Sequence, residues 1–252
     1  SSVSWSKVTS SQFAARSYTE GFVFDNAAVS LFSSQGEDII GLLNSSVFRH
    51  LVSYISPTLN FTVGDVSVAP TPVVIPKSQP AVDLVSIHRD DWDRFERSSQ
   101  FQRAALLEAI SEEGIPSSYE KLLDANLELM QRTHSLERAN NTIFAESFQL
   151  DDSVDLEVPI EQITLTVNPA YRYGLKGTEE GRNTRFREDT MAELVSYAIG
   201  CMMGRFSLDE PGLIYANSGN EGFDDLVQRG AYTKFPADDD GIIPLTDKEW
   251  FA

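Results

Sequence analysis

The spacing of apolar residues changes several times along the chain and predicts a mixture of strands and helices. In residues 3–33, aromatic and branched residues stand among Ser and Thr, and Phe22 and Phe24 alternate with small or polar neighbours, which favours β structure. From residue 37 onward, apolar residues recur at spacings of three and four, which is typical of a helix with one buried face. This stripe consists of Ile40, Leu43, Val47, Leu51 and Tyr54.

Short polar motifs predict where these elements begin and end. Ser34 and Glu37 have the spacing of a capping box, in which two side chains satisfy amides of the first helical turn. Ser56-Pro57 predicts the end of the same helix, because the residue before a proline avoids helical geometry. Apolar and polar residues then alternate over 59–63, which predicts a strand.

A proline-rich segment predicts the boundary between two modules. Residues 69–80 carry four prolines, and proline at this density blocks both helices and central strands. We therefore place the first module at 1–76 and the second at 77–252. The second module is expected to contain helical structure over 81–141, a strand near 161–167, a helix near 190–206 that opens with a capping box of Thr190 and Glu193, and an acidic tail segment.

The predicted fold class is α+β. The first module combines strands with a helix, and the second is mainly α-helical with one short strand. Gly200 and Gly204 lie one turn apart in the predicted helix near 190–206. Each glycine weakens a helix by about 1 kcal/mol and is tolerated best where another backbone packs close. We therefore predict that Gly204 lies where this helix meets another element.

The charge of the chain is strongly acidic but unevenly distributed. The formal net charge is -18. A protein that wraps DNA by itself is not expected to be so acidic, because Lys and Arg supply most non-specific affinity for phosphates. Residues 1–80 hold 4 basic and 5 acidic side chains, and residues 168–206 hold 6 and 5. Residues 81–167 hold 7 and 18, and residues 207–252 hold 3 and 10. DNA affinity is therefore expected in the two near-neutral segments.

The composition also excludes several classes of protein. Hydrophobic residues make up 41% of the chain, as in ordinary globular domains. The single cysteine, Cys201, cannot form an internal disulfide, and three histidines far apart in the sequence do not suggest a zinc site, so we predict no bound metal. The sequence has no apolar stretch of membrane-spanning length and no signal peptide, which predicts a cytoplasmic protein without a membrane partner.

One tetrapeptide resembles a catalytic motif. Asn168-Pro-Ala-Tyr171 follows the predicted strand and is similar to the Asn-Pro-Pro-Tyr loop with which amino-methyltransferases hold a flipped base. Ala170 replaces the second proline, and no glycine-rich loop that could hold a methyl donor is found. We therefore interpret Asn168 as part of a turn and predict no catalytic residue in this chain.

A basic and aromatic cluster follows this turn, in a predicted loop. Such a composition suits phosphate contact with base stacking. Interleaved acidic residues, among them Glu179 and Asp189, equally allow an internal ion network, and the sequence leaves both interpretations open. The cluster consists of Tyr171, Arg172, Tyr173, Lys176, Arg182, Arg185 and Arg187.

Several stretches closely resemble PglX-type BREX adenine-specific DNA methyltransferases, which are type IIG-like enzymes. Residues 196–209, SYAIGCMMGRFSLD, followed by GLIYA at 212–216, are similar to a signature stretch of that family. Residues 57–65, PTLNFTVGD, are similar to the end of the target-recognition region. Further matches in family order are Trp5-Ser-Lys7, Gly21-Phe-Val-Phe-Asp25, Leu43-Asn44-Ser45, Asp91-Trp92-Asp93, Pro169-Ala-Tyr171-Arg172-Tyr-Gly174 and Ile242-Ile-Pro244-Leu-Thr.

The resemblance implies a parent enzyme that transfers a methyl group from S-adenosylmethionine to adenine N6 and marks host DNA as self in BREX phage defence. It implies that this chain is a fragment that follows the methyltransferase core. The donor-binding and catalytic motifs of the family find no position here, so the fragment is expected to be non-catalytic and without a cofactor of its own. Its expected partners are double-stranded DNA through the parent protein, the methyltransferase core of the same parent, and other BREX subunits.

The resemblance implies that residues 1–76 complete a DNA target-recognition domain and that residues 77–252 form an α-rich C-terminal module. Two other functions stay open: an acidic protein-protein interaction or DNA-mimic module of a defence complex, and an autonomous methyltransferase with degenerate motifs. If Arg16 and Asn60 do not contact DNA, we expect Arg16 to pair with a carboxylate and Asn60 to satisfy backbone groups in a turn. The candidate DNA-binding residues are Lys7, Ser10, Gln12, Arg16, Asn60, Arg182, Arg185 and Arg187.

Overall fold

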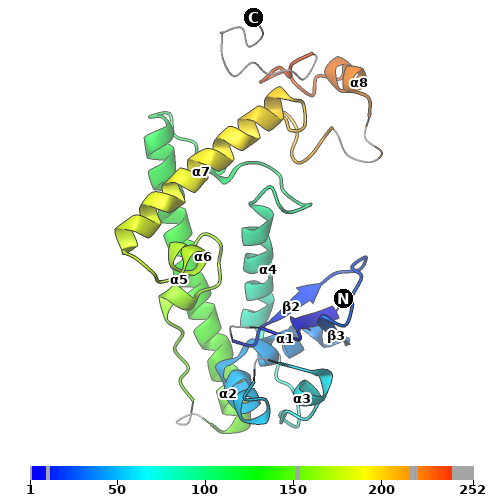
Figure 1. Ribbon diagram of the computed structural model, residues 1–252, viewed down its shortest axis with the longest axis vertical. Coiled ribbons are helices and arrows are strands. Elements are labelled where there is room, and N and C mark those ends of the chain that lie inside the picture. Colours follow the sequence, from blue (N-terminus) through cyan, green and yellow to red (C-terminus); the bar gives the residue numbers. More distant parts are fainter. Residues whose placement is uncertain are drawn as a thin grey trace, which may run out of the picture. The chain divides into compact units, whose positions relative to one another are not determined.

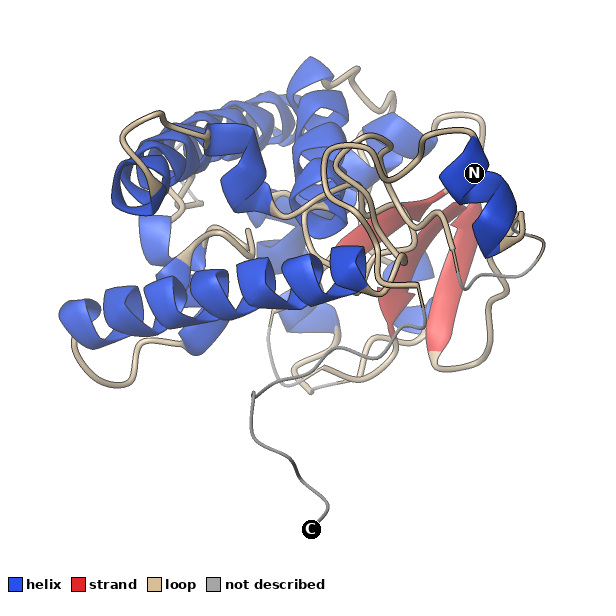
Figure 2. Cartoon of the chain, turned by 90° about the horizontal axis from the view of Figure 1, so that it is seen from above, coloured by secondary structure: helices blue, strands red, loops and turns tan. Residues whose placement is uncertain are grey.

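The computed structural model describes residues 2–9, 12–58, 60–150, 154–215, 219 and 221–239. It confirms the α+β fold class, with one small sheet and many helices (Figures 1 and 2). The strands are β1 (Ser2–Ser6), β2 (Ala15–Tyr18) and β3 (Ala28–Phe32). The α-helices are α1 (Gly36–Asn44), α2 (Ser46–Ile55), α3 (Val63–Ser67), α4 (Gln79–Asp93), α5 (Ile115–Phe148), α6 (Pro169–Tyr173), α7 (Glu179–Met202) and α8 (Phe223–Gln228).

The chain divides into two compact units. Unit 1 contains residues 1–89 and 128–163, and unit 2 contains residues 90–127 and 164–252. The chain therefore leaves unit 1 within α4 and returns to it within α5. The predicted division of roles at residues 76 and 77 concerns function and stays a prediction.

The sheet of unit 1 buries the apolar side chains of one face, and residues on its other face range from buried Ser4 to exposed Arg16. Its strand order is β2-β1-β3, and both pairs are antiparallel, which confirms the β structure expected within residues 3–33. Val3 and Trp5 are buried in the central strand, where they alternate with serines. The Trp5 indole N–H donates a hydrogen bond to the backbone carbonyl of Phe61 at 3.0 Å. The inner face thus joins a core that also includes Phe13 and Phe48.

The single helix expected over residues 37–54 is two helices in the structure. Ser45 separates α1 from α2, and its hydroxyl accepts the backbone N–H of Phe48 at 3.1 Å, as expected of an N-cap. The capping box predicted from Ser34 and Glu37 is wrong, because the N-cap of α1 is Gln35, which makes no side-chain capping bond.

The strand predicted over 59–63 is also wrong. Leu59 lies outside the described residues, and Asn60 forms only an isolated bridge with Val8. Thr62 and Asp65 form a capping box that starts α3 at Val63, so a local cap replaces strand pairing.

The C-terminal half of α5 completes the core of unit 1. Asn140 donates from its amide to the backbone carbonyl of Gly41 at 2.9 Å and accepts the hydroxyl of Ser78 at 2.7 Å. A Cβ added at Gly41 would meet Ala81 Cβ at 2.8 Å and Asn140 Oδ1 at 2.9 Å. Asn141 accepts the backbone N–H of Ser46 at 2.9 Å. Glycine at residue 41 therefore allows α1 and α5 to approach closely.

Helical structure predicted over 81–141 is confirmed for α4 and α5 but not between them. Residues 94–114 contain only a short 3-10 helix, Ala105–Ala109. The strand predicted near 161–167 is wrong. A 3-10 helix, Ile160–Gln162, starts this stretch, and the backbone N–H groups of Thr166 and Val167 donate to the Asp91 carboxylate instead of to a neighbouring strand.

The helix expected near 190–206 begins eleven residues earlier. Thr178 is the N-cap of α7, and its hydroxyl accepts the backbone N–H of Gly181. The capping box predicted at Thr190 is wrong, because the Thr190 hydroxyl donates to the backbone carbonyl of Phe186 inside the helix. The acidic segment after residue 206 contains α8, and residues 240–252 lie outside the described part of the chain.

The predicted contact of Gly204 with another element is confirmed, but its place inside the helix is wrong, because α7 ends at Met202 and the close neighbours are side chains. Gly204 follows the end of α7 with φ +74°, a left-handed conformation that favours glycine. A Cβ at this position would meet Phe223 Cε2 at 2.9 Å and Tyr232 Oη at 3.2 Å. The Tyr232 hydroxyl donates to the backbone carbonyl of Gly204 at 2.7 Å, so residue 204 both turns the chain and packs against α8.

Candidate nucleic-acid interface

The Asn168 turn starts a short helix. The Asn168 side chain accepts the backbone N–H of Ala170 at 3.1 Å and caps α6, with Pro169 in the first turn. Asn168 is 4% exposed. Its amide oxygen therefore has a local structural role, which supports the interpretation of this tetrapeptide as a turn.

Arg172 of α6 belongs to an internal ion network with α7. Its Nη2 atom lies 3.3 Å from Asp189 Oδ2 and 2.8 Å from Glu193 Oε1. The Tyr173 hydroxyl donates to the same Asp189 oxygen at 2.7 Å, and burial together with this hydrogen bond raises the pKa of Tyr173. The Arg172 guanidinium also lies 5.2 Å from the ring centroid of Phe95. For Arg172 and Tyr173, the internal network is thus the arrangement found.

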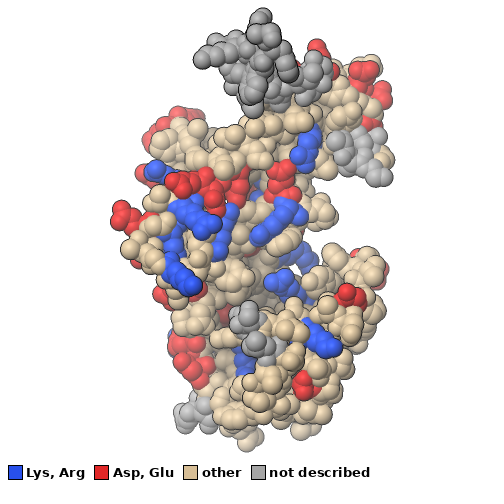
Figure 3. Space-filling view, in the orientation of Figure 1, with Lys and Arg blue, Asp and Glu red and all other residues tan. Residues whose placement is uncertain are grey.

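The three other arginines of the predicted basic loop lie on α7 instead. At 100° per residue, Arg182 and Arg185 share one side of this helix, whereas Arg187 points to another. The Arg185 guanidinium lies 4.6 Å from the ring centroid of Tyr173, and Arg182 donates to the backbone carbonyl of Gly177. Figure 3 shows basic side chains gathered over the α6–α7 region, with acidic side chains directly beside them.

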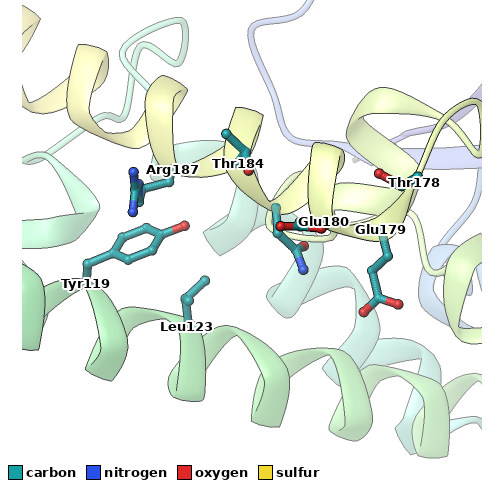
Figure 4. A pocket seen from close by; sticks show the side chains of 8 residues that line it. Tyr119, Leu123, Thr178, Glu179, Glu180, Thr184 and Arg187 are labelled. Atoms are coloured by element: carbon teal, nitrogen blue, oxygen red, sulfur yellow. The ribbon is translucent and has the colours of Figure 1, made fainter.

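Arg187 lines an open groove between α5 and α7 in unit 2 (Figure 4). The groove has a volume of about 740 Å³. Tyr119 lies beside Arg187; burial raises the pKa of this phenol and the guanidinium opposes that rise. Glu179 and Glu180 line the same groove, so its mixed charge does not favour a phosphate backbone. The full lining consists of Tyr119, Leu123, Thr178, Glu179, Glu180, Asn183, Thr184 and Arg187.

The candidate residues of the first module lie at different places in unit 1. Lys7 follows β1, and its backbone N–H and carbonyl bond Ala27 and Phe61. Arg16 is exposed on β2. The Asn60 side chain is exposed, while the backbone of this residue bonds Ser56 and Thr58 in a turn. Ser10 lies outside the described residues.

Gln12 is hydrogen-bonded to Arg49, a residue that the sequence pattern did not indicate. Gln12 Oε1 accepts a hydrogen bond from Arg49 Nη1 at 3.0 Å. Both residues line a groove of about 630 Å³ in unit 1, together with His50 and several hydroxyl side chains. Only the position of Arg49 off the apolar stripe of α2 could have indicated it, because the sequence contains no partner at a helical spacing.

Glu137 of α5 is electrostatically coupled to Arg49. Burial raises the pKa of Glu137 to about 7, and the Arg49 charge opposes this rise. Burial likewise lowers the pKa of Arg49, and Glu137 opposes that change. The Arg49 guanidinium that binds Gln12 therefore also interacts electrostatically with a carboxyl whose pKa is raised.

Comparisons with known proteins identify relatives along nearly the whole chain. The adenine-specific methyltransferase BrxX of Escherichia coli O9:H4 (strain HS) is 37% identical over 258 aligned residues, gaps included. The match covers 98% of this chain and 21% of that protein. The predicted resemblance to PglX-type methyltransferases is confirmed. A further PglX-type relative, the adenine-specific methyltransferase PglX of Lacticaseibacillus casei (strain Zhang), is 27% identical over 99% of this chain and 20% of its own length.

The chain spans about a fifth of the length of these PglX-type relatives. No protein-family model matches it.

Within the described residues, no group of three or more His, Cys, Asp or Glu side chains is arranged to hold a metal ion. Across the same part of the chain, every helix is too short or too polar for a membrane span.

Proposed function

We propose that this chain is a DNA-recognition and scaffold portion of a BREX phage-defence methyltransferase that methylates adenine N6 and marks host DNA as self. The observation that carries this proposal is the 37% identity to BrxX over 98% of the chain. In this proposal, other parts of the parent bind S-adenosylmethionine, and DNA reaches the chain through the parent protein. The fragment itself does not transfer the methyl group.

The geometry at Asn168 supports a non-catalytic role. A base-holding Asn must direct its amide toward a flipped adenine. The Asn168 amide oxygen instead accepts the N–H of Ala170, and the residue is almost fully buried at the start of α6. The resemblance of residues 168–171 to the catalytic loop is therefore one of sequence and not of exposed chemistry.

Two surfaces are candidates for DNA binding, and the surface of unit 1 is the better candidate. Arg16 is exposed on the sheet, and Gln12 and Arg49 form a hydrogen-bonded pair on a groove wall. Arg and Gln are side chains that read guanine and adenine edges in the major groove. On α7, Arg185 stacks on Tyr173 and lies beside the ion network of Arg172, so part of the basic cluster is already committed within unit 2.

The experiment compares two double variants in the full-length protein that carries this segment. Lys7→Ala combined with Arg16→Ala should weaken DNA binding and lower the slope of log affinity against log salt by about 1 for each phosphate that the variant no longer binds. Arg182→Ala combined with Arg185→Ala should leave the slope unchanged. Lys77→Ala removes an exposed cation from the proline-rich segment of unit 1 and serves as the matched control.

The outcomes of this comparison separate the two surfaces. If only the α7 variant lowers affinity and slope, the DNA surface lies on unit 2. If neither variant changes DNA binding or adenine methylation, the recognition role is wrong. A weaker affinity in all three variants, the Lys77 control included, would indicate a general charge effect and contradict the assignment to Lys7 and Arg16.

A further inference from the structure

The outer face of the sheet in unit 1 carries aromatic side chains where polar ones are expected. Ser2 of β1 pairs with Tyr18 of β2 on one side and with Phe32 of β3 on the other, so the three side chains stand in one row. Because side chains alternate along a strand, this row lies opposite to buried Val3 and Trp5. An antiparallel sheet with one solvated face normally shows polar residues there.

The β2–β3 connection extends this aromatic row. Phe22 packs edge-on against Tyr18, and Phe24 packs edge-on against Phe32, each with ring centroids 5.2 Å apart. These rings nevertheless stay open: Phe22 is 64%, Phe24 is 58% and Phe32 is 63% exposed. Val23, between the two phenylalanines, is 98% exposed. We call Tyr18, Phe22, Val23, Phe24 and Phe32 the aromatic tip.

An exposed apolar cluster of this kind marks a surface that another molecule or segment covers. Two carboxylates, Glu20 and Asp25, flank the apolar triplet, and both residues are exposed. They repel the phosphates of DNA and attract a rim of Lys or Arg. The exposed cation Arg16 stands on the neighbouring row of the same face, where the aromatic tip ends. The charges therefore favour a protein surface at the tip and leave DNA to the Arg16 side.

We propose that the aromatic tip docks into an apolar surface with a basic rim on another segment of the same methyltransferase polypeptide. This inference rests on the proposed function, because it takes the chain to work as a portion of a longer enzyme. The matched relatives are about five times as long as the part of them that this chain covers, so ample polypeptide exists to supply that surface. The docking holds the sheet against the remainder of the enzyme and thereby orients Arg16.

The test replaces Phe22 with the photo-crosslinking amino acid p-benzoylphenylalanine in the full-length protein, with a second variant at Phe24. The same replacement at Tyr54, an exposed aromatic residue of α2 in the same unit, is the matched control. After irradiation with and without a DNA duplex, crosslinked peptides are identified by mass spectrometry. Both tip variants should crosslink within one polypeptide to a peptide outside these 252 residues, independently of DNA, and the control should not.

Each other outcome overturns the docking proposal. A crosslink to DNA makes the tip a nucleic-acid wedge, a crosslinked dimer makes it an interface between two copies, and the absence of any crosslink from both tip variants leaves the tip uncovered. Failure of the proposed function is seen separately, because it leaves DNA binding unchanged in both the Lys7 and Arg16 variant and the Arg182 and Arg185 variant, whether or not the tip crosslinks.

Discussion

The buried carboxylate of Asp91 accepts the backbone N–H of Thr166 at 2.7 Å. The neighbouring N–H of Val167 donates to the other carboxylate oxygen at 3.2 Å, so one side chain of α4 holds an extended stretch that has no strand partner. Asp91→Ala should lower the free energy of unfolding by about 2 to 4 kcal/mol, because it leaves the part-buried amide of Thr166 and the buried amide of Val167 without an acceptor.

Urea unfolding followed by circular dichroism would measure this decrease. Asp90→Ala is the matched control, because Asp90 is the exposed neighbour on the same helix. Equal unfolding curves for the two variants would show that Asp91 does not stabilise this stretch.

Gly204 should be sensitive for two physical reasons that a control can separate. Its positive φ strains any side chain, and a Cβ there would press on Phe223. Gly204→Leu should destabilise the fold by about 1 to 3 kcal/mol through overpacking. Gly177 also has a positive φ, but a Cβ there meets nothing within 4 Å. The melting temperature of Gly204→Ala should therefore fall below that of Gly177→Ala; equal values would assign the whole effect to backbone strain.

Arg172 and Arg185 should differ in what their removal costs. Arg172→Ala should lower the free energy of unfolding by about 1 to 3 kcal/mol, because the Asp189 and Glu193 carboxylates lose their shared cation. Arg185→Ala should cost less than about 1 kcal/mol, since an exposed cation–π contact with Tyr173 is weak. Thermal unfolding of the two variants would measure both effects, and the reverse order would contradict a structural role for Arg172.

Glu137 should make the stability of unit 1 depend on pH. Its pKa is raised from 4.5 to about 7, so the folded chain binds more protons than the unfolded chain between these values. Stability therefore falls as the pH rises through this window, and the decrease is complete above about pH 7. Glu137→Gln should remove this part of the pH dependence. Melting curves from pH 4 to 8 would check it, with exposed Glu146→Gln on the same helix as the control.

The alternation of residues 161–167 shows which part of the fold a local pattern can predict. Ile163, Leu165 and Val167 are buried as their spacing indicates. The same spacing suggested a strand, because extended chains usually pair with another strand. Here the partner of the amides is Asp91, which lies seventy-five residues before Thr166. Burial was predictable from the pattern, but the hydrogen-bond partner was not.

The predictions of the helix boundaries and of the site residues were incomplete for a related reason. A capping box is a short motif, and Thr190 with Glu193 satisfies its spacing inside α7, whereas the cap that forms is Thr178. In the site, the sequence indicated Gln12 but not Arg49, which meets it across thirty-seven positions of the chain. The choice between an ion network and a DNA surface also needed the fold, because α6 and α7 bring Arg172 to Asp189.

The return of the chain to unit 1 limits which segments can be exchanged between relatives of this protein. An exchange of residues 1–76 alone would replace α1 and leave Asn140 and Phe144 of α5 unchanged. A foreign α1 would then have to pack against these two side chains. Gly41 tolerates no side chain at this close approach, so α1 and the last turns of α5 must change together. A transplanted copy of residues 1–76 should therefore carry the rest of unit 1, residues 77–89 and 128–163, with it. Natural recombination within residues 1–76 should succeed only between chains that share this glycine and this asparagine.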